Sequence, residues 1–150
     1  MTAACLNVAE RIRILGICPV FSAVPADSLG VLAEMMETER FGAGEVLFEH
    51  GDSSDRIYVV AAGSLSVLLP GGADPARTLG PGELLGEYGM FSALARTATV
   101  KARTQAVLMS LDYQRFRAFL LQFPEATLAL LKTAVQRLIA AEAKLSGEID

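Results

Sequence analysis

The segment from Leu85 to Val100 holds the residues whose types and spacing best suit chemistry. It places Glu87 directly after Gly86, and Arg96 nine residues after Glu87, among mostly apolar neighbours. An isolated charge is costly to remove from water, so each of these two charges needs either a partner or a function. The segment is therefore the candidate functional site of the chain.

The residue types in this segment indicate a site for an anion. Gly86 and Gly89 allow close approach of the backbone to a ligand and permit a positive φ, and a helical turn over 87–93 would expose free N–H groups. Arg96 carries a planar fork that can hold two phosphate oxygens, and Thr97 adds a hydroxyl and a backbone N–H. These donors predict a phosphate ligand.

Glu87 does not fit a site that binds an anion alone. A carboxylate accepts hydrogen bonds and repels phosphate, so it better suits a pair of hydroxyls such as those of a ribose. Phosphate and sugar together predict a nucleotide. Each residue also has a simpler interpretation: Glu87 as a helix N-terminal carboxylate, Arg96 as a surface cation or the partner of Glu87, and Thr97 as the start of a strand.

The segment resembles the phosphate-binding cassette of the cyclic nucleotide-binding domain family. That pattern begins with Phe-Gly-Glu and ends with Pro-Arg, a small residue and Ala-Thr-Val. The residues that match it in register are Gly86, Glu87, Met90, Arg96, Thr97, Ala98, Thr99 and Val100. The chain departs from the pattern at Leu85, Tyr88, Gly89 and Ala95. Residues 41–67 resemble the first strands of the family, with glycines at 44, 51 and 63, and the likeness covers roughly residues 15–145.

This resemblance implies a ligand, cAMP or cGMP, and a role for each matching residue. By resemblance, the cyclic phosphate is held by Arg96, Thr97 and Gly89, and the ribose by Glu87 and Gly86. Possible contacts to the base or the lid are Tyr88, Arg137 and Leu138. The implied function is a regulatory domain that senses a cyclic nucleotide and transmits binding through movement of its C-terminal helices. No other cofactor and no metal are expected.

The elements that must position these residues follow from turn signals and periodicity. Turns recur about every ten residues over 41–112, which predicts an antiparallel β-roll, jelly-roll-like in the manner of a double-stranded β-helix. Helices are expected over 5–15 and from the Pro25–Ser28 signal to about Thr38, so that about 1–38 form the N-terminal helices. Strands are expected over 97–101 and 106–111. The C-terminal lid helices are expected from Tyr113 to about Leu121 and from Pro124 to Leu145, followed by a frayed end or linker over 146–150.

The last predicted helix carries an apolar stripe with two possible functions. Its members follow a spacing of three and four residues: Leu128, Leu131, Val135, Leu138 and Leu145. The stripe could pack against the roll, or it could form the seam of a homodimer, and both could hold over different turns.

Composition restricts the classes of protein to which this chain can belong. A length of 150 residues suits one domain over 1–150. Hydrophobic residues make up 52% of the chain, yet no run of about 18 apolar residues predicts membrane insertion. A net charge of −4 argues against direct binding of nucleic acid by this segment. The chain has two cysteines, Cys5 and Cys18, which are too few for a disulfide framework. No signal peptide is visible in the sequence. The expected location is therefore the cytoplasm, or the cytosolic side of a membrane protein.

The sequence contains no set of residues suited to catalysis, so an enzyme is not expected. His50 is the only histidine, whereas metal sites and histidine catalysis need further ligands or orienting groups. Ser64 and Ser66 lie in an apolar strand pattern, and the glycines at 71–72 fit a turn better than a phosphate loop. Two alternatives to sensing remain: a ligand-free roll used as an interaction or oligomerisation module, and the effector domain of a transcription regulator without its DNA-binding module. In either case other domains of a larger protein are possible partners.

Overall fold

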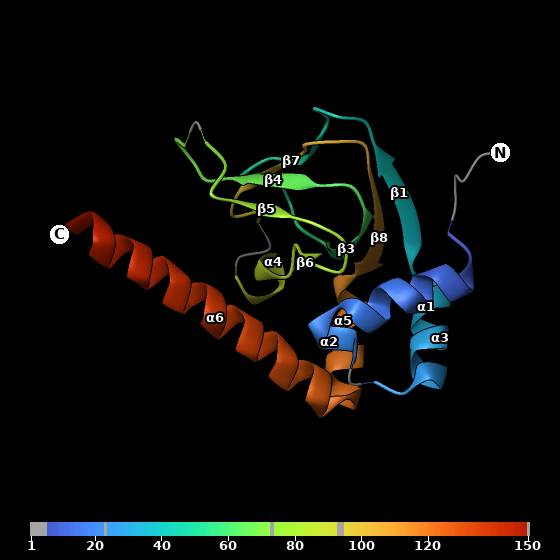
Figure 1. Ribbon diagram of the computed structural model, residues 1–150. Coiled ribbons are helices and arrows are strands. Elements are labelled where there is room, and N and C mark those ends of the chain that lie inside the picture. The colour runs from blue at the N-terminus through green and yellow to red at the C-terminus, as the bar shows by residue number, and fades with distance from the viewer. Residues whose placement is uncertain (1–5, 23, 73, 93–94, 150) are drawn as a thin grey trace.

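The computed structural model describes residues 6–22, 24–72, 74–92 and 95–149 (Figure 1). Its helices are α1 (Val8–Ile17), α2 (Pro19–Ser22), α3 (Ala26–Met35), α4 (Tyr88–Phe91), α5 (Tyr113–Gln122) and α6 (Pro124–Ile149). Its strands are β1 (Glu37–Phe41), β2 (Val46–Phe48), β3 (Arg56–Ala62), β4 (Leu65–Leu68), β5 (Arg77–Leu79), β6 (Leu84–Leu85), β7 (Thr99–Ala102) and β8 (Ala106–Asp112). The strands form two antiparallel sheets in the orders β1-β8-β3-β6 and β2-β7-β4-β5. The predicted antiparallel β-roll with flanking helices is confirmed.

Strand β3 is buried on both of its faces, which explains much of the high apolar content. Successive side chains of a strand point to opposite faces. Ile57, Val59 and Ala61 therefore pack against the helices, whereas Tyr58 and Val60 pack inside the roll. The neighbouring strand β8 divides its side chains between the same two cores. Strands β3 and β8 thus lie between the helical core and the core of the roll.

None of the described helices is by itself long and apolar enough to span a membrane. Helices α5 and α6 satisfy the criterion only as a pair, and the pair is bent by 111°.

The N-terminal helices α1 and α3 are joined to each other through polar contacts. Helix α1 begins with a capping box in which Asn7 and Glu10 exchange side-chain and backbone hydrogen bonds. The Arg11 guanidinium then donates to the Ala33 and Met36 carbonyl oxygens, at 2.8 and 2.6 Å. These carbonyls lie at the C-terminal end of α3, where helix hydrogen bonds are missing. Arg11 therefore fixes α1 against α3.

Three predicted boundaries near the N-terminus need correction. The second helix ends at Met35 and not near Thr38, because Thr38 lies in β1, which pairs with β8 along its whole length. The roll therefore begins at Glu37 and not at 41. The sequence also missed α2: proline ends one helix but is tolerated in the first turn of the next, as Pro19 is here. The predicted start at residue 5 lies outside the described residues, and α1 begins at Val8.

Helix α6 differs from the prediction in its length and in its packing. It continues to Ile149, beyond the expected end at Leu145, so residues 146–149 belong to the helix and not to a frayed end or linker. It packs on the helical core through Ala126 and Leu130. The predicted apolar stripe does not pack against the roll, since its members are 44–59% exposed: Leu128, Leu131, Val135, Leu138 and Leu145. Packing of the stripe was therefore a wrong interpretation, and the dimer seam stays a prediction.

The buried thiol of Cys18 gives a direct test of this core. The side chain is 0% exposed, and burial raises the pKa of the thiol to about 11. In a Cys5→Ser variant at pH 8 we expect no reaction of Cys18 with a disulfide reagent until guanidinium unfolds the chain, when one thiol per chain should react. A matched variant that also carries Ser146→Cys, on the exposed part of α6, should react at once. Fast labelling of Cys18 in the folded protein would contradict this packing.

Candidate functional site

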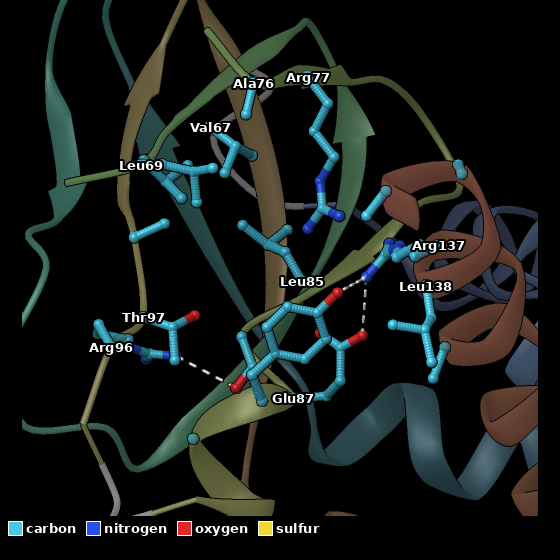
Figure 2. Close-up of a pocket in the computed structure, with 18 of the residues that line it drawn as sticks. Val67, Leu69, Ala76, Arg77, Leu85, Glu87, Arg96, Thr97, Arg137 and Leu138 are labelled. Carbon is cyan, nitrogen blue, oxygen red and sulfur yellow. Dashed lines mark hydrogen bonds and ion pairs between the residues drawn. The ribbon is translucent and has the colours of Figure 1, made fainter. Parts of the chain in front are cut away.

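A cavity of about 650 Å³ lies between the interior of the roll, α4 and the middle of α6 (Figure 2). All eight residues predicted from the sequence line it: Gly86, Glu87, Tyr88, Gly89, Arg96, Thr97, Arg137 and Leu138. They come from two parts of the chain, residues 86–97 and the middle of α6. The structure thus assembles the predicted residues around one space.

Arg96 is a buried cation without a carboxylate partner among the described residues. It is only 5% exposed, and its guanidinium lies over the Phe48 ring at 4.1 Å from the ring centroid. One N–H group, at Nη1, donates to the Gly86 carbonyl at 3.3 Å, while the buried Nε has no hydrogen-bond partner in the described structure. The interpretation of Arg96 as a surface cation or as the partner of Glu87 is therefore wrong. A buried donor without a partner is uncommon in a folded protein and needs an explanation.

Backbone hydrogen bonds and Gly86 fix the position of Arg96. Its N–H donates to the Asp52 carbonyl and its own carbonyl accepts from the Gly51 N–H, both at 2.8 Å. Gly86 has φ +88°, and a Cβ there would lie 2.7 Å from Nη1 of Arg96. The Gly86 carbonyl also accepts from the Tyr113 hydroxyl. Gly86 is thus required for its conformation and for the space it leaves to the guanidinium.

Gly89 is needed because of two hydroxyls that the sequence did not single out. It is the second residue of α4 and is buried, and a Cβ on it would collide with the hydroxyls of Ser54 and Tyr113. These two hydroxyls hydrogen-bond to each other. Ser54 lies in a polar turn and Tyr113 at a helix start, so neither carried a sequence signal.

Thr97 lies beside Arg96 at the wall of the cavity and is exposed. Strand β7 begins at Thr99, so the predicted strand over 97–101 starts two residues too early. The interpretation of Thr97 as a strand opener is therefore wrong.

Glu87 is paired with a residue from the C-terminal helix. Glu87 is only 5% exposed. Its carboxylate oxygen Oε2 accepts a hydrogen bond from Nη1 of Arg137 at 3.1 Å. Arg137 also donates to the Tyr88 hydroxyl and the Leu84 carbonyl, both at 3.3 Å. Glu87 stands at the N-cap position of α4, but its side chain makes no capping hydrogen bond. The carboxylate therefore serves the cavity and the contact with α6, and not the helix end.

Burial makes the ionised form of Glu87 costly. It raises the pKa of this carboxyl above its ordinary value, and Arg137 offsets that effect only in part. Burial also acts to lower the pKa of Arg137, but Glu87 and Tyr88 outweigh it and raise the pKa. Because the pKa of Glu87 is higher in the folded chain, this group stabilises the fold at acidic pH, and that contribution is lost as the pH rises through the folded pKa.

The fold and the site define a class: a β-roll whose interior holds a buried arginine and a buried glutamate beneath a C-terminal helix. Residues 38–123, more than half of the chain, match the family model described as cyclic nucleotide-binding domain. The chain belongs to this family.

Three comparisons show the range of proteins that it resembles. An uncharacterized ABC transporter ATP-binding protein of Mycobacterium tuberculosis is 42% identical over 84 residues, which are 54% of this chain and 26% of that protein. A cyclic nucleotide-gated potassium channel of Mesorhizobium japonicum is 31% identical over 125 residues, which are 83% of this chain and 34% of the channel. The regulatory domain of Toxoplasma gondii PKA with cAMP has a TM-score of 0.72 at 22% identity, over 86% of this chain and 50% of that one. The chain therefore spans only a minor part of the two relatives.

Proposed function

We propose that this chain senses a cyclic nucleotide, cAMP or cGMP, and that binding changes the position of α6. The buried, unpaired guanidinium of Arg96 is the observation that carries the proposal. Removing such a charge from water is unfavourable unless a compensating anion arrives. A cyclic phosphate bears one negative charge and two exocyclic oxygens, which match the arginine fork. Thr97 and the backbone of Gly89 would complete the phosphate site.

Glu87 would hold the ribose hydroxyl on the next part of the cavity wall. An ionised carboxylate accepts hydrogen bonds only, so the 2′-hydroxyl is a suitable donor. Arg137 now occupies one of its oxygens. The ligand would therefore either share Glu87 with Arg137 or displace it, which links the ribose directly to α6.

Helix α6 would act as the lid over the base. It contributes Ala134, Leu138, Ala141 and Lys144 to the cavity lining. If α6 has two positions, the ligand can change their relative populations only by as much as its affinities for the two differ. The proposed mechanism is binding and population shift, and it involves no catalysis.

The apolar stripe on α6 and the lengths of the relatives suggest how the signal would leave the domain. The five members of the stripe are 44–59% exposed and follow a spacing typical of a helical dimer seam. We infer a homodimer through α6 as one possible partner. The other partners would be further domains of a larger protein, since the chain covers 26% of the transporter protein and 34% of the channel.

Thermal unfolding with and without ligand tests the proposal. At a concentration of about 100 times the dissociation constant, cAMP or cGMP should stabilise the chain by about 2.7 kcal/mol, which is roughly 5–10 °C in the midpoint. Linear 5′-AMP and 5′-GMP serve as controls, because their terminal phosphate has a different charge and shape. If neither cyclic nucleotide moves the midpoint at millimolar concentration, sensing is refuted and the ligand-free interaction module takes its place.

A further inference from the structure

Tyr113 connects helix α5 to a residue of the cavity wall. It is the first residue of α5, it is not among the described residues that line the cavity, and its ring packs on the helical core. Its hydroxyl donates to the Gly86 carbonyl oxygen and is hydrogen-bonded to the Ser54 hydroxyl. Its backbone N–H donates to the Asp55 carbonyl at 2.8 Å. One tyrosine therefore joins α5 to the turn before β3 and to the cassette.

The direction of these hydrogen bonds follows from the number of protons available. A phenol has one O–H group, which can donate once, and its oxygen can also accept. Since the Tyr113 proton goes to the Gly86 carbonyl, the bond to Ser54 uses the serine proton, with the tyrosine oxygen as acceptor. Ser54 is only 5% exposed, so water offers it little alternative. Ser54 thus donates to Tyr113, and Tyr113 donates to Gly86.

Gly89 provides the space that the two hydroxyls occupy. A Cβ at this position would collide with the Ser54 oxygen and would lie 2.5 Å from the Tyr113 oxygen. Gly89 is also one of the four positions at which the chain departs from the family pattern. The hydroxyls of Ser54 and Tyr113 fill the room that this departure leaves. The missing side chain and the pair of hydroxyls therefore belong to one arrangement.

The Gly86 carbonyl is the point at which this arrangement meets Arg96. It accepts from the Tyr113 hydroxyl and, at 3.3 Å, from Nη1 of Arg96. A carbonyl oxygen has two lone pairs, so both donors can bind at once. A phosphate that takes the Nη1 donor would remove one of them. With the Tyr113 hydroxyl in place the partly buried carbonyl keeps a partner, and without it the carbonyl would be left unsatisfied.

We propose that Tyr113 is a positioning residue of the phosphate site, which holds the Gly86 carbonyl and so allows Arg96 to turn from that carbonyl to a phosphate. This inference rests on the proposed function. Tyr113 acts through Gly86 and through the turn at Gly89, which its hydroxyl packs against. Ser54 in turn orients the Tyr113 hydroxyl. Because every cyclic nucleotide has the phosphate, the effect should not depend on the base.

Binding of cAMP and cGMP to the full chain and to Tyr113→Phe, measured by calorimetry, tests the inference. The substitution keeps the ring in the helical core and removes only the hydroxyl. Both dissociation constants should rise roughly 5- to 50-fold and by the same factor, because an acceptor is left unsatisfied when Arg96 binds phosphate. Ser54→Ala should weaken binding less. The double variant should bind no more weakly than Tyr113→Phe alone, because Ser54 acts through the tyrosine.

Thr104→Val is the matched control for the loss of a hydroxyl that is only structural. The Thr104 hydroxyl donates to the Gln105 carbonyl and accepts from the Ser64 N–H in the turn after β7. Its loss should lower the thermal midpoint of the unliganded chain and change neither affinity. A purely structural role for Tyr113 predicts the same result for Tyr113→Phe. The change in affinity is therefore the measurement that separates positioning from packing.

Other results would overturn the inference in distinguishable ways. Unchanged affinities in Tyr113→Phe, with binding intact in the unmodified chain, would refute it and leave the proposed function standing. Losses that add up in the double variant would show that Ser54 does not act through Tyr113. A loss for one nucleotide only would mean that the hydroxyl acts on the base. If the unmodified chain binds neither nucleotide, the proposed function itself fails, and this inference fails with it.

Discussion

Replacing Arg96 by alanine should weaken the binding of both cAMP and cGMP by about 100-fold or more. The guanidinium is 5% exposed and has no carboxylate partner in the described structure, so a bound phosphate would be its counter-charge. The loss should affect both nucleotides equally, because the cyclic phosphate is common to them. Calorimetry gives the two dissociation constants, and the ligand-induced shift of the thermal midpoint should nearly disappear.

The controls for Arg96→Ala separate charge, geometry and folding. Arg96→Lys keeps the charge and loses the fork, so it should recover only part of the affinity. Arg117→Ala removes an exposed arginine of α5 and should change neither affinity. The unliganded Arg96→Ala chain should remain folded, because the lost stacking on Phe48 is offset by removal of a buried, unpaired charge. An unchanged nucleotide response in this variant would refute the phosphate contact.

Gly63→Ala should cause the largest loss of stability among the glycine substitutions outside the site. Gly63 joins β3 to β4 with φ +87°, and a Cβ there would collide with the Gln105 carbonyl and lie 2.8 Å from the Ala106 Cα. These are backbone atoms of the neighbouring turn, which cannot move without disturbing β8. Strain from the positive φ and the clash together should cost about 3 kcal/mol of unfolding free energy.

Gly44→Ala is the matched control for this prediction. Gly44 has φ +88°, but nothing lies within 4 Å of a Cβ added to it. It should therefore cost only the conformational strain, about 1 kcal/mol. Because the chain has no tryptophan, urea unfolding is best followed by far-UV circular dichroism. Suppose that the two variants lose the same free energy of unfolding. The turn between β3 and β4 would then tolerate the methyl group added at Gly63, and the clash argument would fail.

Much of the fold could be predicted because its signals are local. Turn glycines and prolines recur along the roll, and proline positions mark where α5 ends and α6 begins. The errors fall where long-range contacts decide. Thr38 was assigned to a helix, but pairing of β1 with β8, about 70 residues further on, makes it a strand residue. The apolar stripe of α6 was open to two interpretations, and only the exposure of its members excluded packing against the roll.

The candidate site was predicted as a set of residues, but not as a set of contacts. The eight predicted residues do line one cavity, because the cassette pattern keeps its donors and acceptors in a fixed register. The pairing of Glu87 with Arg137 joins residues 50 positions apart and has no sequence signal. The same holds for Ser54 and Tyr113, whose hydroxyls account for the absence of a side chain at Gly89.

The sequence by itself determined the class of fold and was enough to predict the kind of ligand, because both depend on short patterns of turn residues, alternation and cassette chemistry. The tertiary structure decided which charges are paired. Among the described residues it left the buried Nε groups of Arg96 and Arg77 without a hydrogen-bond partner and joined Glu87 to α6. The physical reason is that the free energy of a buried charge depends on what packs around it, and the neighbours of these charges come from strands and helices that only folding brings together.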